Sequence, residues 1–290
     1  MTLHTIRSEA LVASFLEKGA ELVSLKCQHQ EALWGGAPDV WPRHAPVLFP
    51  IVGRLKDDAM IVYGKNYGLT QHGFARDLDF SVTHVNESQI CFLLQATKET
   101  LSHYPFHFSL SVLYTLQNNS LLASFIVRNN SNTALPFSLG WHPAFAVPNP
   151  SYSNKARDYS ISFSAEEDWR TPVLENGLLT LKTQNPPVTS RQISWSETLF
   201  DQDALIFLSV NSRAVELRSQ EKIVLRMDTS DFPTLGIWSK PKAGFICLEP
   251  WVGYASPADF KGEFGEKPGI VTLPPYSERR WDCRIDFATS

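Results

Sequence analysis

The feature that most constrains the fold is an alternation of side chains in the middle of the chain. Between residues 106 and 116 an apolar side chain occupies every second position. A period of two residues places alternate side chains on opposite faces of a β-strand, and it does not match the 3.6-residue period of a helix. Asn118 and Asn119 then favour a turn, and a second apolar run follows at residues 121–127. The segment therefore predicts a long antiparallel hairpin.

Short strand-like segments continue through the rest of the chain. They are apolar or alternating runs bounded by glycine, proline or polar clusters, which favours strands over helices. These segments are residues 10–16, 20–25, 80–85, 90–95, 159–163, 204–210, 214–217, 223–227, 235–238, 245–248, 269–273 and 280–287. The absence of a fixed-period repeat disfavours a propeller. We therefore predict an all-β fold, a large antiparallel sandwich in which residues 1–290 form a single domain.

Two local patterns give further expectations. Residues 63–67 predict a hairpin turn with Lys65 and Asn66 near its tip. His103 and His107 have the spacing of one helical turn, but Pro105 between them argues against a helix. We therefore expect both histidines at strand edges rather than in a metal pair.

Composition excludes several classes of protein. With 43% hydrophobic and 19% charged residues the chain is expected to fold, and a formal net charge of −4 gives no basic surface for nucleic acid. No stretch reaches the ~18 consecutive apolar residues of a membrane-spanning helix. The first residues lack the pattern of a signal peptide. We expect a cytoplasmic protein without membrane or nucleic-acid partners, either a monomer or a homodimer.

The cysteines give no sign of a metal site or a disulfide framework. The four of them, at positions 27, 91, 247 and 283, are scattered, and none forms a C-x-x-C pair. No phosphate-binding loop, nucleotide fingerprint or nucleophile elbow is present. The sequence thus predicts neither a metal nor a cofactor.

Four short motifs carry the residues that suit chemistry on a sugar. They are FPIVGR at residues 49–54, QHGFAR at 71–76, GWHPAF at 140–145 and CLEPW at 247–251. Together they supply two histidines, a carboxylate, two arginines and two tryptophans. Imidazole and carboxylate groups serve as acids and bases near neutral pH, and indole rings offer apolar faces to a pyranose.

His142 and Glu249 are the candidate acid–base groups. Pro143 pushes His142 toward extended backbone geometry, so the alternative for this histidine is a strand-end residue bonded to a backbone carbonyl. Glu249 is expected at the end of the apolar strand formed by residues 245–248, where burial raises the pKa of a carboxyl group. Its alternative is a buried ion pair with an arginine.

The other candidates bind rather than react. Arg54, Arg76 and His72 can contact sugar hydroxyls, and either arginine can equally hold a carboxylate. Asp203 is a further candidate, but Asp201 lies two residues away and would face the same side of a strand. Trp238 can cover a sugar ring or belong to the core.

Taken in order, these motifs resemble those of the aldose 1-epimerases, the galactose mutarotase-like family, and most of all its LacX-like branch. The resemblance extends from about residue 10 to the last residues. It implies a β-supersandwich fold and an isomerase that interconverts the α and β anomers of free aldoses without a cofactor or metal. It makes Glu249 the general base and His142 the general acid, while Arg54, His72 and Asp203 bind the sugar.

Two points remain open after the resemblance. The best-known mutarotases have an Asn-Arg pair where this chain has Gly53-Arg54, so the preferred sugar is not determined. The arginine-rich phosphate clamp of the hexose-phosphate epimerases is not evident. The alternatives are a hexose-phosphate epimerase and a non-catalytic carbohydrate-binding or regulatory protein on the same fold.

Overall fold

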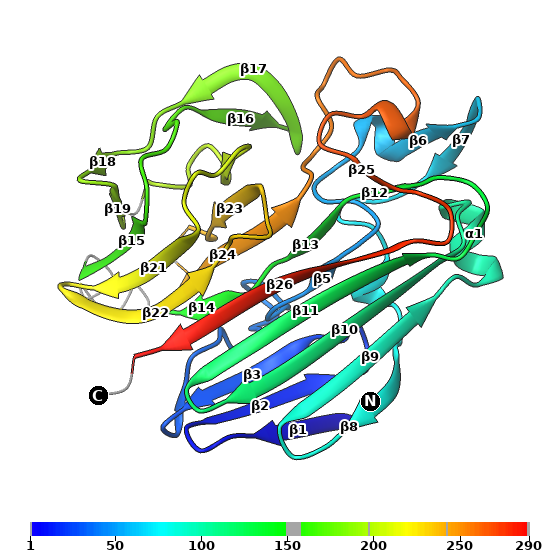
Figure 1. The fold of residues 1–290 in the computed structure, drawn as a ribbon. Helices are drawn as coiled ribbons and strands as arrows, with labels where there is room; N and C mark the ends of the chain where they lie inside the picture. The colour runs from blue at the N-terminus through cyan, green and yellow to red at the C-terminus, as the bar shows by residue number, and fades with distance from the viewer. Residues whose placement is uncertain (1, 149–157, 197, 242, 289–290) are drawn as a thin grey trace.

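A computed structural model describes residues 2–148, 158–196, 198–241 and 243–288. The described chain is almost entirely β-structure, arranged in large antiparallel sheets (Figure 1), which confirms the predicted fold class. Among these residues no helix is both long enough and apolar enough to span a membrane.

The largest sheet has ten strands and contains the hairpin expected from the alternation. β10 (Phe108–Gln117) pairs with β11 (Ser120–Asn129) along its whole length, and Asn118 adopts a positive φ of 52° in the turn. Alternate positions of β10 are buried, as a period of two requires. The remaining strands of this sheet are β8 (Ser81–Val85), β9 (Gln89–Gln95), β15 (Tyr159–Phe163), β18 (Val188–Thr189), β19 (Gln192–Ser194), β21 (Ala214–Ser219), β22 (Lys222–Asp228) and β26 (Glu278–Phe287).

A second sheet runs in the order β20-β23-β24-β13-β5, and β14 also pairs with β24. Its strands are β5 (Val47–Leu48), β13 (Leu139–Trp141), β14 (Ala144–Ala146), β20 (Leu205–Phe207), β23 (Thr234–Trp238) and β24 (Phe245–Val252). Every residue of β24 is buried. A strand buried on both faces is apolar at consecutive positions instead of alternating, which explains why residues 245–248 form a continuous apolar run.

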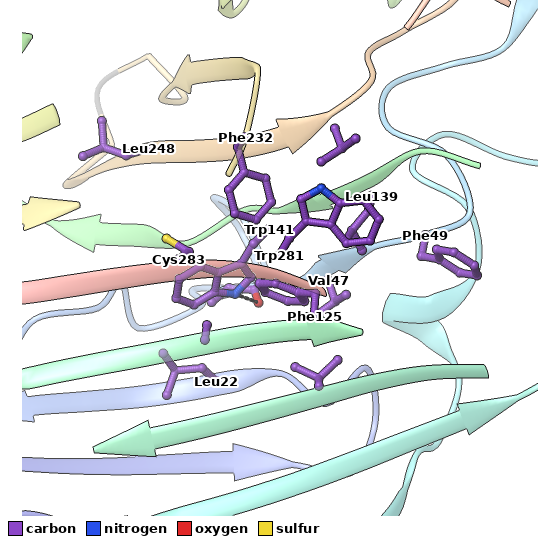
Figure 2. Packing of buried hydrophobic residues seen from close by; sticks show 14 of the residues in the cluster. Leu22, Val47, Phe49, Phe125, Leu139, Trp141, Phe232, Leu248, Trp281 and Cys283 are labelled. Atoms are coloured by element: carbon purple, nitrogen blue, oxygen red, sulfur yellow. Dashed lines mark hydrogen bonds between the residues drawn. The ribbon is translucent and has the colours of Figure 1, made fainter. Parts of the chain in front are cut away.

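Aromatic side chains fill the space between these two sheets (Figure 2). Trp141 of β13 lies with its ring centroid 6.0 Å from that of Phe125 on β11, and Phe137 lies 5.8 Å from Trp281 on β26. The indole N–H of Trp141 donates to the carbonyl of Ala45 at 3.1 Å, so the polar atom of this buried ring is satisfied. This core supports one face of the strands that hold the site.

Smaller elements surround the two sheets. They are the four-stranded sheet β1 (Leu3–Arg7), β2 (Leu11–Leu16), β3 (Leu22–Cys27) and β4 (Gln30–Glu31); the pairs β6 (Ala59–Val62) with β7 (Lys65–Gly68), β12 (Leu135–Phe137) with β25 (Val271–Leu273), and β16 (Thr171–Glu175) with β17 (Leu178–Gln184); the helix α1 (Lys98–His103); and the 3-10 turns η1 (Lys56–Asp58), η2 (Ala75–Asp77) and η4 (Phe264–Glu266).

Two local expectations were wrong. The β6–β7 hairpin turns at Tyr63 and Gly64, which both have positive φ, and Lys65 already pairs with Val62. Such a two-residue turn needs positive φ at both central positions, and Gly64 meets that need. His103 is the last residue of α1 rather than a strand-edge residue; the proline that argued against a helix lies just beyond the helix end.

Candidate active site

His142 lies immediately after β13, with its backbone fixed by a neighbouring segment. Its N–H donates to the carbonyl of Pro46 at 3.0 Å. The imidazole stacks on Trp41 at a centroid distance of 5.0 Å and meets the edges of Trp238 and His72 at 5.8 and 5.9 Å. The ring is 8% exposed, so it is held among aromatic groups while one side still reaches a cavity.

Glu249 lies within β24 rather than at a strand end, which corrects the expectation from the apolar run. Its side chain is 1% exposed, and its Oε2 lies 3.1 Å from Nε2 of His142. The contact is not a hydrogen bond, since Oε2 of Glu249 is buried without a hydrogen-bond partner among the described residues. Nδ1, the other ring nitrogen of His142, is also buried without one. The structure therefore brings the two candidate acid–base groups together with lone pairs still unused.

Burial shifts the two groups in opposite directions. Desolvation, helped by the negative charge of Asp203, raises the pKa of Glu249 well above its usual value. Desolvation, helped by the positive charges of Arg76 and Arg43, lowers the pKa of His142 to about 3. Both shifts disfavour charge, so a proton shared by the pair is displaced from the imidazole toward the carboxyl group.

Trp251 lies two residues beyond Glu249 and fills the space over two glycines on the neighbouring strands. A Cβ atom added to Gly140 of β13 would lie 2.6 Å from Cδ1 of this indole, and one added to Gly236 of β23 would lie 2.6 Å from its Cη2. Only glycine therefore lets the ring lie flat across the sheet. Gly236 is also the register partner of Glu249, so the ring and the carboxylate share one supported surface.

His72 comes from a loop with an unusual backbone. It has a φ of 68°, and it exchanges two contacts with Gly53: its N–H donates to the Gly53 carbonyl at 2.8 Å, and its Nδ1 accepts the Gly53 N–H at 3.1 Å. Because Nδ1 is an acceptor, the neutral ring carries its proton on Nε2. Desolvation, with the charges of Arg76, His142 and Arg43, lowers the pKa of His72 well below its usual value, so this ring is neutral and offers an N–H donor.

These side chains line a cavity of about 330 Å³. This volume is within the range of small-molecule sites. Five of the six residues predicted for the site line this cavity: His72, His142, Asp203, Trp238 and Glu249. Arg76 lines it as well. Asp203 rather than Asp201 faces the cavity. The two aspartates lie in a turn before β20 and not on a strand, and Asp203 has a φ of 73°, so their spacing does not put them on one face.

Arg54 does not line the cavity. Its guanidinium group binds the carboxylate of Asp58 through two hydrogen bonds of 2.7 and 2.6 Å, and donates a third to the carbonyl of Asn176 at 3.1 Å. Its side chain lies behind Gly177, which does line the cavity. The structure thus places Arg54 one layer behind the wall and leaves its proposed contact with sugar untested.

Residues 2–268 match the aldose 1-epimerase family. The chain belongs to that family. It is 33% identical to the LacX protein of Lactococcus lactis over 97% of this chain and 98% of that protein. Among solved structures it is similar to a galactose mutarotase related enzyme from Lactobacillus acidophilus, with 35% identity and a TM-score of 0.93 over 99% of this chain and 98% of the other. A galactose mutarotase-like protein from Lactobacillus casei gives 29% identity and a TM-score of 0.92 over 99% and 100%.

In this aldose 1-epimerase family member the cavity lining also includes Arg76, which was expected to bind a sugar hydroxyl or a carboxylate, and Trp41, which the sequence did not single out. Arg76 closes the QHGFAR motif that contains His72. Its Nε is buried without a hydrogen-bond partner among the described residues and lies 3.7 Å from the carboxylate of Asp77. Desolvation lowers the pKa of Arg76 to about 10, so it remains charged at neutral pH. The motif already contained the signal for Arg76. Trp41 lies in a loop without periodicity, and only its contact with His142 reveals it.

A larger cavity, of about 520 Å³, lies beside the β6–β7 hairpin. Its described lining includes one carboxylate, that of Asp57, and no histidine. Lys267 lies there with its ammonium group donating to the carbonyls of Tyr254 and Pro268 at 2.5 and 3.1 Å. The acid–base pair characteristic of the predicted chemistry is in the smaller cavity, so size does not identify the active site of this epimerase-family protein.

Proposed function

We propose that the protein is an aldose 1-epimerase that interconverts the α and β anomers of a free aldose in the His142–Glu249 cavity. The observation that carries this proposal is the 3.1 Å approach of Nε2 of the buried His142 to Oε2 of the buried Glu249, an oxygen without a hydrogen-bond partner among the described residues. Anomer exchange needs one group to take the O1 proton and another to protonate the ring oxygen. A pair of this kind does both, each group contributing roughly 10²–10⁴-fold.

Ring opening transfers two protons in opposite directions. Glu249 as carboxylate takes the proton of the anomeric hydroxyl, and His142 as imidazolium gives its proton to the ring oxygen. The bond between C1 and the ring oxygen breaks, and O1 becomes the aldehyde oxygen. Rotation about the C1–C2 bond presents the other face of the aldehyde, and the reverse transfers close the ring. No proton is lost to solvent, and no cofactor takes part.

Burial acts on the two stages of the cycle in opposite senses: it raises the free energy of the charged pair that begins ring opening and lowers that of the uncharged pair that ring opening produces. Ring opening converts a carboxylate and an imidazolium into a carboxylic acid and a neutral imidazole, which is the arrangement that the shifted pKa values of Glu249 and His142 favour. The open-chain stage is thereby stabilised relative to the closed stage. Ring closure is then favoured by the lower free energy of the cyclic form of the sugar.

The remaining cavity residues hold the sugar in place. His72 donates a hydrogen bond from its Nε2–H group, and Asp203 accepts hydrogen bonds from sugar hydroxyl groups. Trp238 covers an apolar face of the sugar ring. The stacked Trp41 keeps His142 from rotating. These contacts exist in both the ground state and the transition state, so their loss raises KM more than it lowers kcat.

A second candidate, a hexose-phosphate epimerase, is favoured by Arg76 alone. Arg76 lines the cavity, and its ion pair with Asp77 is long, at 3.7 Å from Nε. A phosphate or other anion on the sugar would give this positive charge a closer partner.

Polarimetry tests both candidates. Freshly dissolved α-glucose, α-galactose and their 6-phosphates are followed with and without the purified protein. Faster mutarotation of a free aldose supports the first proposal, and acceleration confined to the phosphates supports the second. Tight sugar binding without acceleration of any of them would identify a carbohydrate-binding protein instead.

A further inference from the structure

Cys247 completes a cluster of three potential metal ligands around the candidate pair. The cluster contains one ligand atom from each of His142, Cys247 and Glu249. These atoms lie within 4.8 Å of one another, and all three residues are buried. Cys247 and Glu249 are two residues apart on β24, so their side chains leave the strand on the same face. His142 approaches from the end of β13. The sequence contains no C-x-x-C pattern that would indicate this cluster, because its ligands come from two strands.

The cluster has unused lone pairs. Oε2 of Glu249, the oxygen that lies 3.1 Å from Nε2 of His142, is buried and has no hydrogen-bond partner in the described part of the chain. The thiol of Cys247 is fully buried in a small apolar cluster with Phe245. Unpaired buried polar atoms are costly, and a cation placed among them would satisfy them.

We propose that His142, Cys247 and Glu249 form a zinc site, and that bound Zn²⁺ inhibits the enzyme. A thiolate, an imidazole and a carboxylate are the three side-chain ligand types that zinc takes in proteins. The thiolate favours Zn²⁺ over Mg²⁺ or Ca²⁺. Three protein ligands leave a fourth position for water or a sugar hydroxyl.

The geometry needs only small movements to hold the ion. Zinc bonds of about 2.0–2.3 Å at tetrahedral angles place ligand atoms roughly 3.3–3.8 Å apart. The ligand atoms lie within 4.8 Å of one another, and Nε2 of His142 and Oε2 of Glu249 are 3.1 Å apart. The ion enters through the cavity that His142 and Glu249 line. Binding releases the thiol proton to solvent.

Inhibition follows from which lone pairs the ion occupies. A carboxylate and an imidazole that both coordinate Zn²⁺ cannot exchange protons with a sugar. The inhibitory consequence rests on the proposed epimerase function, whereas the binding of the ion does not.

The binding test uses Zn²⁺ and its spectroscopic substitute Co²⁺, titrated into protein stripped with EDTA. We expect one ion per chain and, with Co²⁺, a near-ultraviolet charge-transfer band from the thiolate. Cys247→Ala should abolish the band and weaken Zn²⁺ binding at least roughly tenfold, which is about 1.4 kcal/mol. The matched control is Cys283→Ala, which removes an equally buried thiol from β26 and should leave both readouts unchanged. Glu249→Gln should weaken binding to a similar extent, and it keeps the test decisive if Cys247→Ala fails to fold.

The activity test follows mutarotation at increasing Zn²⁺. Wild type should lose activity over the concentrations at which Zn²⁺ binds and recover it with EDTA. Relative to its own rate without Zn²⁺, Cys247→Ala should need at least roughly tenfold more Zn²⁺ for half-inhibition. Equal binding to wild type and Cys247→Ala, or a Co²⁺ complex without the thiolate band, would overturn the zinc site. Because these two results are obtained without sugar, they decide the site even if the protein shows no mutarotation.

Discussion

Nε2 of His142 and Oε2 of Glu249 lie 3.1 Å apart, one at the end of β13 and the other within β24. β13 and β24 pair directly, with Gly140 opposite Trp251. The backbone hydrogen bonds of the sheet therefore position both groups, and neither depends on a flexible loop for its place.

We expect Glu249→Gln and His142→Asn each to lower kcat by roughly 10²–10⁴-fold. Each change keeps most of the side-chain volume and removes one proton-transfer group. If the two act in one exchange, the double variant should be little slower than either single variant, because groups that act as a unit are not additive. The measurements are kcat for the three variants and sugar affinity by calorimetry, and affinity should change much less than kcat. A Glu249→Gln protein with the wild-type kcat would remove this carboxyl group from the mechanism.

The two arginines of the motifs should differ in what they affect. We expect Arg76→Met to raise KM roughly tenfold, because a charged donor lining the cavity is lost. Arg54→Met should act indirectly, since its guanidinium group is already bound to Asp58. Asp58→Asn is the discriminating control: it should reproduce the Arg54→Met effect on KM if Arg54 only supports the wall. Wild-type KM in Asp58→Asn, with a raised KM in Arg54→Met, would instead indicate direct contact of Arg54 with the sugar.

The strands could be predicted because their signal is local. The alternation in residues 106–116 reflects one buried and one exposed face of β10, and the turn residues after it reflect the hairpin geometry. The position of Glu249 was misjudged for the opposite reason. β24 is buried along its whole length, so its apolar run ends before the strand does, and the carboxyl group is tolerated inside because it faces the cavity.

The partners of the site residues could not be read from the sequence. Arg54 is drawn away from the cavity by Asp58 and by the carbonyl of Asn176, which lies in a distant turn. Asp201 and Asp203 were separated by a turn whose dihedral angles no alternation rule describes. Trp41 reaches His142 from an irregular loop. The contacts of Arg54 with Asn176 and of Trp41 with His142 join segments remote in the chain, whereas the turn at Asp203 is local but follows no periodic pattern.

Gly236→Ala tests the support beneath the candidate pair. The added Cβ would lie 2.6 Å from Cη2 of Trp251, a buried ring with little room to shift. We expect the free energy of unfolding to fall by about 1–3 kcal/mol. We also expect a lower kcat, because Gly236 is the register partner of Glu249. Gly35→Ala is the control, since nothing lies within 4 Å of its added Cβ; urea unfolding and kcat should both be close to wild type there. A stable Gly236→Ala protein with normal kcat would show that the Trp251 ring can move without cost.

Lys267 should make the protein more stable as pH rises above neutral. Burial lowers the pKa of Lys267 from 10.5 to about 7, and this difference corresponds to on the order of 5 kcal/mol. Between these two values the unfolded chain still holds the lysine proton while the folded chain has lost it. The unfolded state then binds more protons, so the free energy of unfolding increases with pH. Below about pH 7 both states are protonated and the lysine contributes no pH dependence.

The measurement is the free energy of unfolding in urea at pH 7, 8 and 9, below the range in which tyrosines ionise. Lys267→Met should remove most of the rise between pH 7 and 9 seen in wild type. Its absolute stability is not the readout, because the variant also leaves the carbonyls of Tyr254 and Pro268 without their donor. Lys261→Met changes an exposed lysine of the same cavity and should retain the rise. The same pH dependence in Lys267→Met and wild type would mean that the ammonium group stays protonated in the folded protein, held by its two carbonyls and the ring of Tyr254.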